Sequence, residues 1–418
     1  MKLTWQNDRT TMMRAALQTE QDGDDGRSIA LASPSMIGSA NRLRILQALY
    51  DFGPMSRVEM ARQANVNRTT ITGIVQPLLA DGLLVEGDAV PPSMLGGKPA
   101  RRLFFNPDAP AIAALLLLPG KICTCLVTLT GDISAFFATT FSPADTTEDV
   151  TRLIEDQLAQ TLAAASHPPF GIGIAAGGMV DSDRGVIVTV NLAPALNNLA
   201  LVDRLAARFN LPATIDHHPR ALLLGDRWFG LGRSLHNFAA VYTGEVLGGA
   251  LYLDGQVYRG LSGSGGELGH TIVQIDGSRC NCGNHGCWET VATLSWLRNE
   301  ARARGFEAPE TLSTRRLLTM VENGITEAEP LLDLYARNLA IGIANLQQTM
   351  SPNDFILHGD AAAGGEAMAM RIKQQVEAFT RPRPSQQIKI VMNRGNEDHV
   401  ALKGAAGLVL SKMLKPAM

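Results

Sequence analysis

The stretch from His270 to Glu289, HTIVQIDGSRCNCGNHGCWE, limits the fold of this chain more than any other segment. It contains three of the five cysteines in the chain, Cys280, Cys282 and Cys287. Three thiolates and one imidazole match the closed tetrahedral ligand set of a structural zinc site. A group of buried thiols beside a turn is the alternative, since free cysteine also packs as a small hydrophobe. We expect zinc, because a CxCGxxGC cluster in a chain otherwise poor in cysteine is a metal-binding pattern.

The composition sets bounds without indicating a function. A chain of 418 residues is long for one domain, so two or three compact units are expected. The net charge of −3 argues against a wholly basic nucleic-acid coat but allows a small basic module. An odd number of cysteines fits a reducing compartment better than a disulfide framework. The longest apolar run, residues 111–118, is too short for a transmembrane helix, and the first residues lack the apolar core of a signal peptide. We therefore expect a cytoplasmic protein without a membrane partner.

Residues 1–36 are polar and predict a flexible N-terminal extension, whereas the residues that follow predict short helices. Residues 41–53 have apolar side chains at helical spacing and end in Gly-Pro. Ser56 and Glu59 form the capping-box pattern of a second helix, and Asn67 can cap a third. The inner face of the second helix is expected to consist of Val58, Ala61 and Ala64. Two strands around a loop of Pro, Gly and Lys follow, so the pattern is typical of a winged helix-turn-helix, with a three-helix protein-interaction module as the alternative.

In a winged helix the third helix enters the major groove and the wing contacts phosphates or the minor groove. Polar residues at the start of the third helix and basic residues of the wing are thus the candidate DNA contacts. They are Asn67, Arg68, Thr69, Thr70, Thr72, Lys98, Arg101 and Arg102.

From about residue 106 the pattern becomes that of an α/β protein. Apolar runs at 111–118, 122–129 and 133–141, joined by short turns, predict a β-meander, and a helix (147–165) and a buried strand (170–178) follow. Strands are expected again within 237–260, at 353–360 and at 387–392, with helices at 289–304, 312–320, 326–349 and 398–414. Cys123 and Cys125 lie two apart in one predicted strand and are expected to pack in the core.

The segments GGELGH and CNCGNHGCWE resemble the signature of the ROK family (repressors, open reading frames, sugar kinases). The resemblance runs from about residue 41 to the C-terminus. It implies a two-lobed ribonuclease-H-like domain of the actin and sugar-kinase type, preceded by the winged helix that ROK repressors carry. It also implies that His270 and the three cysteines hold a structural zinc.

The same resemblance implies sugar contacts at Glu267, His270 and Glu289. Asn191 matches the Asn of a further family motif, while Asp216 and His217 replace an Asn-Asp pair. The effector is then an unusual sugar, or a sugar acid or sugar phosphate that pairs with His217 or His218 when protonated. Two alternatives stay open: residues 216–218 form a surface turn, or the pocket has lost its ligand.

The segments that bind nucleotide in ROK kinases are altered in this chain. The first phosphate turn reads LLLPGKI, with Leu116 in place of an acid and Pro119 in place of a glycine, so one backbone donor is missing. The second turn carries Glu245, whose charge repels phosphate. The catalytic Asp position is His217. We therefore expect no enzymatic activity, with a ROK sugar kinase bearing a DNA-binding head as the alternative.

These expectations combine into a sugar-responsive transcriptional repressor. It would bind an inverted-repeat operator in double-stranded DNA as a dimer or tetramer, with a sugar-transport protein as a further candidate partner. The domain plan is an extension (1–36), a winged helix (37–106), a first lobe (107–230, completed by about 385–418) and a second lobe (231–384) with the zinc site and the dimerisation helices.

Overall fold

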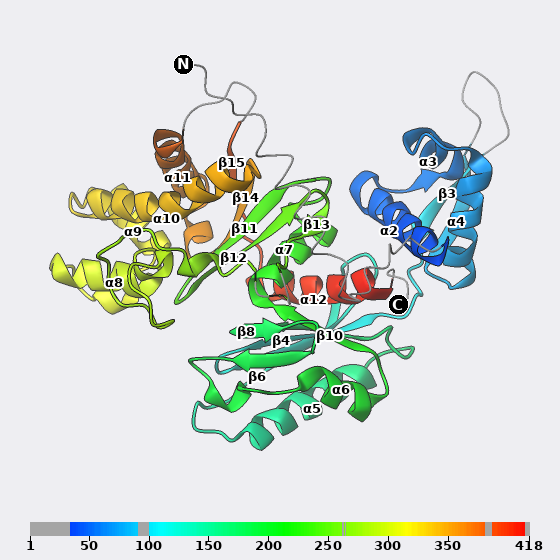
Figure 1. Ribbon diagram of the computed structural model, residues 1–418, viewed down its shortest axis with the longest axis horizontal. Helices are drawn as coiled ribbons and strands as arrows, with labels where there is room; N and C mark the ends of the chain where they lie inside the picture. Colours follow the sequence, from blue (N-terminus) through cyan, green and yellow to red (C-terminus); the bar gives the residue numbers. More distant parts are fainter. Residues whose placement is uncertain (1–33, 91–99, 261–262, 264, 381–386, 414–418) are drawn as a thin grey trace, which may run out of the picture.

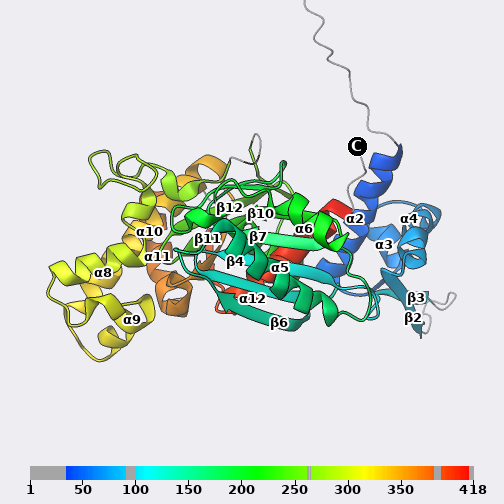
Figure 2. The same ribbon diagram turned by 90° about the horizontal axis from the view of Figure 1, so that it is seen from below.

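The computed structural model describes residues 34–90, 100–260, 263, 265–380 and 387–413, and its elements fall into a small N-terminal head and a two-lobed body (Figures 1 and 2). Most of the predicted N-terminal extension and Lys98 lie outside the described residues. Helical structure already begins at Pro34, inside the segment expected to be an extension. Among the helices of the described residues, none is long and apolar enough to span a bilayer.

The head contains three helices and one antiparallel sheet. The helices are α2 (Pro34–Phe52), α3 (Arg57–Gln63) and α4 (Arg68–Ala80). The sheet has the order β1-β3-β2, formed by β1 (Met55–Ser56), β3 (Ala100–Phe105) and β2 (Leu84–Val90). The three helices and the two later strands follow in the predicted order, whereas the short strand β1 between α2 and α3 was not predicted.

Local sequence signals account for the helix starts in the head. The side chain of Ser56 accepts from the backbone N–H of Glu59, and the Glu59 carboxylate accepts from the backbone N–H of Ser56 at 2.7 Å, which completes the predicted capping box. The side chain of Asn67 caps α4 by accepting from the backbone N–H of Thr70 at 2.8 Å. The predicted inner face of α3 is wrong at two of its three positions, because Val58 and Ala64 are exposed, whereas Ala61 is buried together with Met60.

The body is built on two five-stranded sheets with the same topology. The first has the order β6-β5-β4-β7-β10 and the second β13-β12-β11-β14-β15. In both sheets the first three strands along the chain are antiparallel, and the fourth and fifth are parallel to the first. The bounds in the first sheet are β4 (Ile112–Leu118), β5 (Lys121–Val127), β6 (Ile133–Thr140), β7 (Ile172–Ala176) and β10 (Ala213–His217). Those in the second are β11 (Phe238–Thr243), β12 (Leu247–Leu253), β13 (Gln256–Val257), β14 (Asp354–Gly359) and β15 (Lys389–Met392). The repeat that is faint in the sequence is therefore complete in the fold.

Helices cover both faces of each sheet and create three apolar cores. The outer face of the first sheet packs on α5 (Thr147–Ala163) and α6 (Leu201–Phe209). The outer face of the second sheet packs on α8 (Leu294–Ala303), α9 (Thr314–Glu322), α10 (Ala328–Met350) and α11 (Gly365–Phe379). Between the sheets lie α7 (His218–Phe229) and α12 (Glu397–Met413), which Figure 1 shows side by side. A short hairpin, β8 (Met179–Asp181) with β9 (Val186–Thr189), extends from the first lobe.

Two glycines let α7 and α12 approach closely. A Cβ at Gly404 would lie 1.7 Å from the carbonyl oxygen of Ala221, and a Cβ at Gly225 would lie 2.2 Å from the carbonyl oxygen of Val400. Because any side chain would clash with this backbone, the two helices are fixed against each other.

The return of the chain to the first lobe is later than the sequence suggested. Strand β15 pairs in parallel with β14 in the second sheet, so the segment from about 385 does not complete the first lobe as a whole. Only α12 does so, by packing on β4, β7 and α7. Cys123 and Cys125 are buried in β5, as expected.

Candidate metal centre and adjoining cleft

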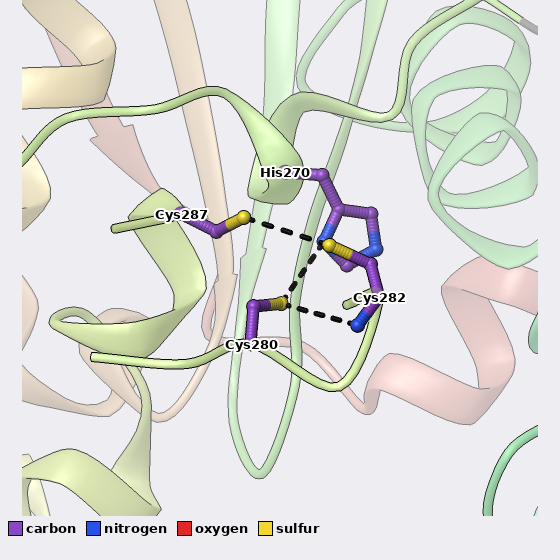
Figure 3. Close-up of side chains that lie close together, drawn as sticks. All are labelled: His270, Cys280, Cys282 and Cys287. Carbon is purple, nitrogen blue, oxygen red and sulfur yellow. Dashed lines mark hydrogen bonds between the residues drawn. The ribbon is translucent and has the colours of Figure 1, made fainter. Parts of the chain in front are cut away.

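Four predicted ligands converge in the second lobe (Figure 3). One ligand atom from each of His270, Cys280, Cys282 and Cys287 lies within 4.8 Å of all the others. The Nδ1 atom of His270 is 3.5 Å from the Sγ of Cys280, and the sulfurs of Cys282 and Cys287 are 3.6 Å apart. Zn–S bonds of about 2.3 Å and Zn–N bonds of about 2.0–2.1 Å at tetrahedral angles place ligand atoms roughly 3.5–3.8 Å apart. The arrangement thus fits a four-coordinate metal ion.

Two short 3₁₀ helices and a tight loop bring these side chains together. His270 ends one 3₁₀ helix (Leu268–His270), and Cys287 directly precedes another (Trp288–Thr290). Gly286 has a φ of +71°, and a Cβ there would lie 1.6 Å from the carbonyl oxygen of Gln274. Only glycine fits this position, and its presence lets the loop return to the first two cysteines.

The environment shifts the pKa values of the three thiols in different directions. Burial raises the pKa of the Cys280 and Cys287 thiols, whereas the backbone N–H of Asn284 lowers the pKa of Cys282 by donating to its sulfur. Three thiolates this close together repel one another, so a divalent cation is what would make the fully deprotonated cluster favourable. The donor set, the spacing and the closed geometry all suit structural zinc.

The metal loop is anchored to α10 through Trp288, a residue that the sequence did not single out. Trp288 is completely buried, and its indole Nε1–H donates to the carbonyl of Asn338 at 2.9 Å. A Cβ at Gly342, one turn further along α10, would lie 2.2 Å from the indole ring. The predicted dimerisation segment 327–349 therefore contributes one face to the core of its own lobe.

Predicted sugar contacts lie beside the metal ligands. The Glu289 carboxylate is 3.5 Å from His270 Nδ1 and 2.9 Å from Cys280 Sγ. Burial lowers the pKa of His217, while the negative charge of Glu267 opposes this shift and His270 adds to it. These interactions place His217, Glu267, His270 and Glu289 in one neighbourhood. Asn191 lies on an exposed loop after β9, and the interactions described above do not include it.

Asp216 has a different role from the predicted direct sugar contact. Its carboxylate is fully buried and accepts from Arg220 Nη1 at 2.7 Å through one oxygen and from Arg259 Nη2 at 2.9 Å through the other. Arg220 also donates to the carbonyls of Gly263 and Gly265 in the second lobe. Asp216 is therefore a buried ion-pair centre between the lobes. Its i, i+4 spacing from Arg220 was visible in the sequence, but the approach of Arg259 requires the fold.

The surface turn considered for residues 216–218 is excluded for the same reason. Asp216 lies within β10, His217 ends that strand at the N-cap position of α7, and His218 begins the helix with a side chain that is only 6% exposed. Its Nε2 lies 4.0 Å from a Glu397 carboxylate oxygen. Burial lowers the pKa of His218 to about 3, so the ring is neutral near pH 7 and does not supply a positive charge to an anionic sugar there.

The predicted DNA contacts lie on the exposed part of the head. Asn67, Arg68, Thr69 and Thr70 are exposed around the start of α4, and Thr72 is half-buried. Thr72 donates its hydroxyl to the carbonyl of Arg68 at 2.9 Å, and Asn67 is engaged as the helix cap. Arg101 and Arg102 are exposed on β3, at the described end of the wing.

Comparison with known proteins agrees with this architecture. Residues 120–412 match the model of the ROK family, which is about two thirds of the chain. The chain belongs to the ROK family. It is 25% identical over 399 residues to the xylose repressor of Caldicellulosiruptor bescii, covering 92% of this chain and 98% of that protein. It is 27% identical over 278 residues to the glucokinase of Thermotoga maritima, covering 64% of this chain and 86% of the kinase.

Among solved structures, this ROK protein is similar to a ROK family transcriptional regulator described as a homolog of the E. coli Mlc protein. The TM-score is 0.75 at 24% identity, and the match covers 91% of this chain and 100% of that one. This likeness supports the fold, including the combination of a head with a two-lobed body.

Proposed function

We propose that this ROK protein is a transcriptional repressor that binds an operator in double-stranded DNA and responds to a sugar or sugar phosphate. The observation that carries the proposal is the extent of the similarity. A xylose repressor aligns with nearly the whole chain, head included, whereas a glucokinase aligns with only 64% of it.

The head supplies the features that DNA binding needs. Helix α4 follows α3 after a short turn, as the recognition helix does in a winged helix-turn-helix, and its first turn exposes Arg68 and Thr69. Arg101 and Arg102 add positive charge on the wing for phosphate contacts. Because such modules act in pairs, the proposal includes a homodimer or tetramer that reads the two half-sites of an inverted repeat. It also includes a cytoplasmic location.

The surroundings of the metal centre are the proposed effector site. Carboxylates accept from sugar hydroxyls, and an imidazole bound to metal through Nδ1 keeps Nε2–H free to donate outward. Glu267, His270 and Glu289 are the proposed contacts, with His217 and Asn191 as further candidates. A structural zinc would hold His270 and the loop that carries Glu289 in place. Asp216 acts indirectly, by holding Arg220 and Arg259.

Phosphoryl transfer is the second candidate function, and the geometry disfavours it. Pro119 occupies the first phosphate turn and cannot donate a backbone hydrogen bond. Lys121, in the same turn, pairs with Asp398 at 2.5 Å. Glu245 occupies the second turn and pairs with Arg298 at 2.5 Å. If these turns correspond to the phosphate-binding turns of the kinases, as the family resemblance implies, they are unsuited to nucleotide, so we propose that the protein is not an enzyme.

The test is selection of genomic DNA fragments on the purified, zinc-loaded protein at near-physiological salt. The expected result is a short palindrome whose binding weakens or strengthens with one member of a panel of pentoses, hexoses, N-acetylhexosamines and their 6-phosphates. Binding that is indifferent to sequence and sensitive only to salt contradicts the proposal. ATP consumption with any sugar of the panel, lost in His217→Ala, supports the kinase instead.

A further inference from the structure

Two consecutive residues near the end of α2, Tyr50 and Asp51, contact the body. The Asp51 carboxylate accepts from both terminal nitrogens of Arg227, at 2.7 and 3.0 Å, and from the backbone N–H of Ser234 at 3.0 Å. The two side chains of the ion pair are 12% and 8% exposed. A bidentate, nearly buried pair of this kind fixes orientation as well as distance.

Tyr50 completes the joint with an aromatic contact. Its ring lies 5.1 Å from that of Trp228 and 5.5 Å from that of Phe229, both at nearly perpendicular angles. Its hydroxyl donates to the carbonyl of Leu129 in the turn between β5 and β6. Arg227, Trp228 and Phe229 are the last three residues of α7, so the head rests on the C-terminal end of that helix.

Beside this joint the head and the body are separated by a cavity of about 650 Å³. Arg44 and Gln47 of α2 line one side, and Asp216 and Arg259 line the other. Two buried polar atoms of lining residues, Arg227 Nε and Ser182 Oγ, have no hydrogen-bond partner among the described residues. The space next to the joint gives the head room to change its angle.

The opposite end of α7 lies at the proposed effector site. His217 caps the helix, and Arg220 in its first turn holds Asp216 and two carbonyls of the second lobe. In the last turn of the helix the buried Asp226 binds His358 Nε2 and Asn393 Nδ2, each at 2.8 Å. Eleven of the twelve residues of α7 are buried, so the helix moves only with its neighbours.

We propose that α7 transmits the effector signal to the head, with Asp51 and Arg227 as the positioning pair. A change in lobe closure shifts the contacts of Arg220 and Asp226 to the second lobe. A helix of twelve residues is roughly 18 Å long, so this shift is carried as a rigid displacement to Arg227 and Trp228. The pair then sets the angle of the head and thereby the spacing of the two DNA-binding surfaces in a dimer. This inference rests on the proposed function.

The experiment compares the wild type with Asp51→Asn and Tyr50→Phe in the full-length, zinc-loaded protein. Operator Kd is measured without sugar and with the active member of the sugar panel, and sugar affinity is measured separately by calorimetry. Glu155→Gln is the matched control, because Glu155 pairs with Arg204 at 2.7 Å on the outer face of the first lobe. Tyr50→Phe removes one hydroxyl and keeps the aromatic packing, so this variant still tests the proposal if Asp51→Asn folds poorly.

We expect both joint variants to bind sugar with wild-type affinity while the ratio of operator Kd with and without sugar falls at least fivefold. Glu155→Gln keeps the wild-type ratio. An unchanged ratio in both joint variants overturns the role of α7 and leaves the repressor function standing. A wild-type protein whose operator affinity no sugar changes overturns the proposed function and, with it, this inference.

Discussion

The indole of Trp288 donates to the backbone carbonyl of Asn338 across 2.9 Å, which ties the metal loop to the longest helix of the second lobe. Because the next residue is Glu289 and the preceding one is Cys287, this bond connects a metal ligand, a proposed sugar contact and the core. The metal centre and the packing of α10 are therefore expected to stabilise each other.

Replacing Cys287 with serine tests the metal centre. The loss of one thiolate should release the zinc and lower the free energy of unfolding by roughly 3 kcal/mol, as loss of a metal site does. Zinc content by mass spectrometry and the urea midpoint measure both effects. Cys123→Ala is the control, because Cys123 is equally buried but lies outside the cluster. A Cys287→Ser protein with full zinc content and wild-type stability would contradict the assignment.

Replacing Gly342 with alanine tests the contact between α10 and the metal loop. The new Cβ would overlap the indole of Trp288, so a loss of about 1–3 kcal/mol is expected from overpacking. Gly73→Ala is the matched control within a helix, since a Cβ there meets nothing within 4 Å. That control should be neutral or stabilising by up to about 1 kcal/mol. Thermal unfolding of the two variants under identical conditions should therefore shift in opposite directions.

Replacing Arg68 with alanine tests the proposed recognition helix. If Arg68 neutralises one phosphate, the slope of log K against log salt should become less steep by about 1. Operator titrations between low and moderate salt measure this slope. Arg208→Ala on α6 removes the same charge from the body and should leave the slope unchanged. Equal slopes for all three proteins would show that Arg68 does not neutralise a phosphate of the operator.

Acidification should destabilise the protein through His218. Its folded pKa of about 3 lies below the ordinary value of 6.5, so the unfolded state binds the proton more readily. The contribution of His218 to the free energy of unfolding is therefore fully present above pH 6.5 and is lost as the pH falls towards 3. At pH 5 this loss is about 2 kcal/mol. The groups facing the ring include Glu397, His358, Lys121 and Tyr242. Burial raises the pKa of Glu397, so protonation of that carboxyl favours the folded state on acidification and partly offsets the effect of His218.

The difference between the wild type and His218→Asn isolates this contribution. Urea midpoints from pH 7.5 to 5 should fall more steeply for the wild type than for the variant. Parallel curves would show that the histidine titrates normally in the folded state.

Features encoded within a few residues were predictable from the sequence. The capping box of Ser56 and Glu59, the Asn67 cap and the four metal ligands all depend on fixed short spacings. The ion pair between Asp216 and Arg259 was not predictable, because the two residues are far apart in sequence and come into contact only when the two lobes pack against each other. Helix α7 was missed for a related reason. Eleven of its twelve residues are buried, including Arg220, Asp226 and Arg227. The ion pairs and hydrogen bonds that allow these charged side chains to be buried form only in the folded protein.

The late position of α12 in the chain has a consequence for biosynthesis. Leu410 of α12 lines the same apolar contact as Tyr50 and Trp228. The contact between head and body therefore stays incomplete until the ribosome has released the chain past that residue. The head, whose last strand ends at Phe105, can fold far earlier. The orientation of the head relative to the body is therefore expected to be set only when translation is nearly complete.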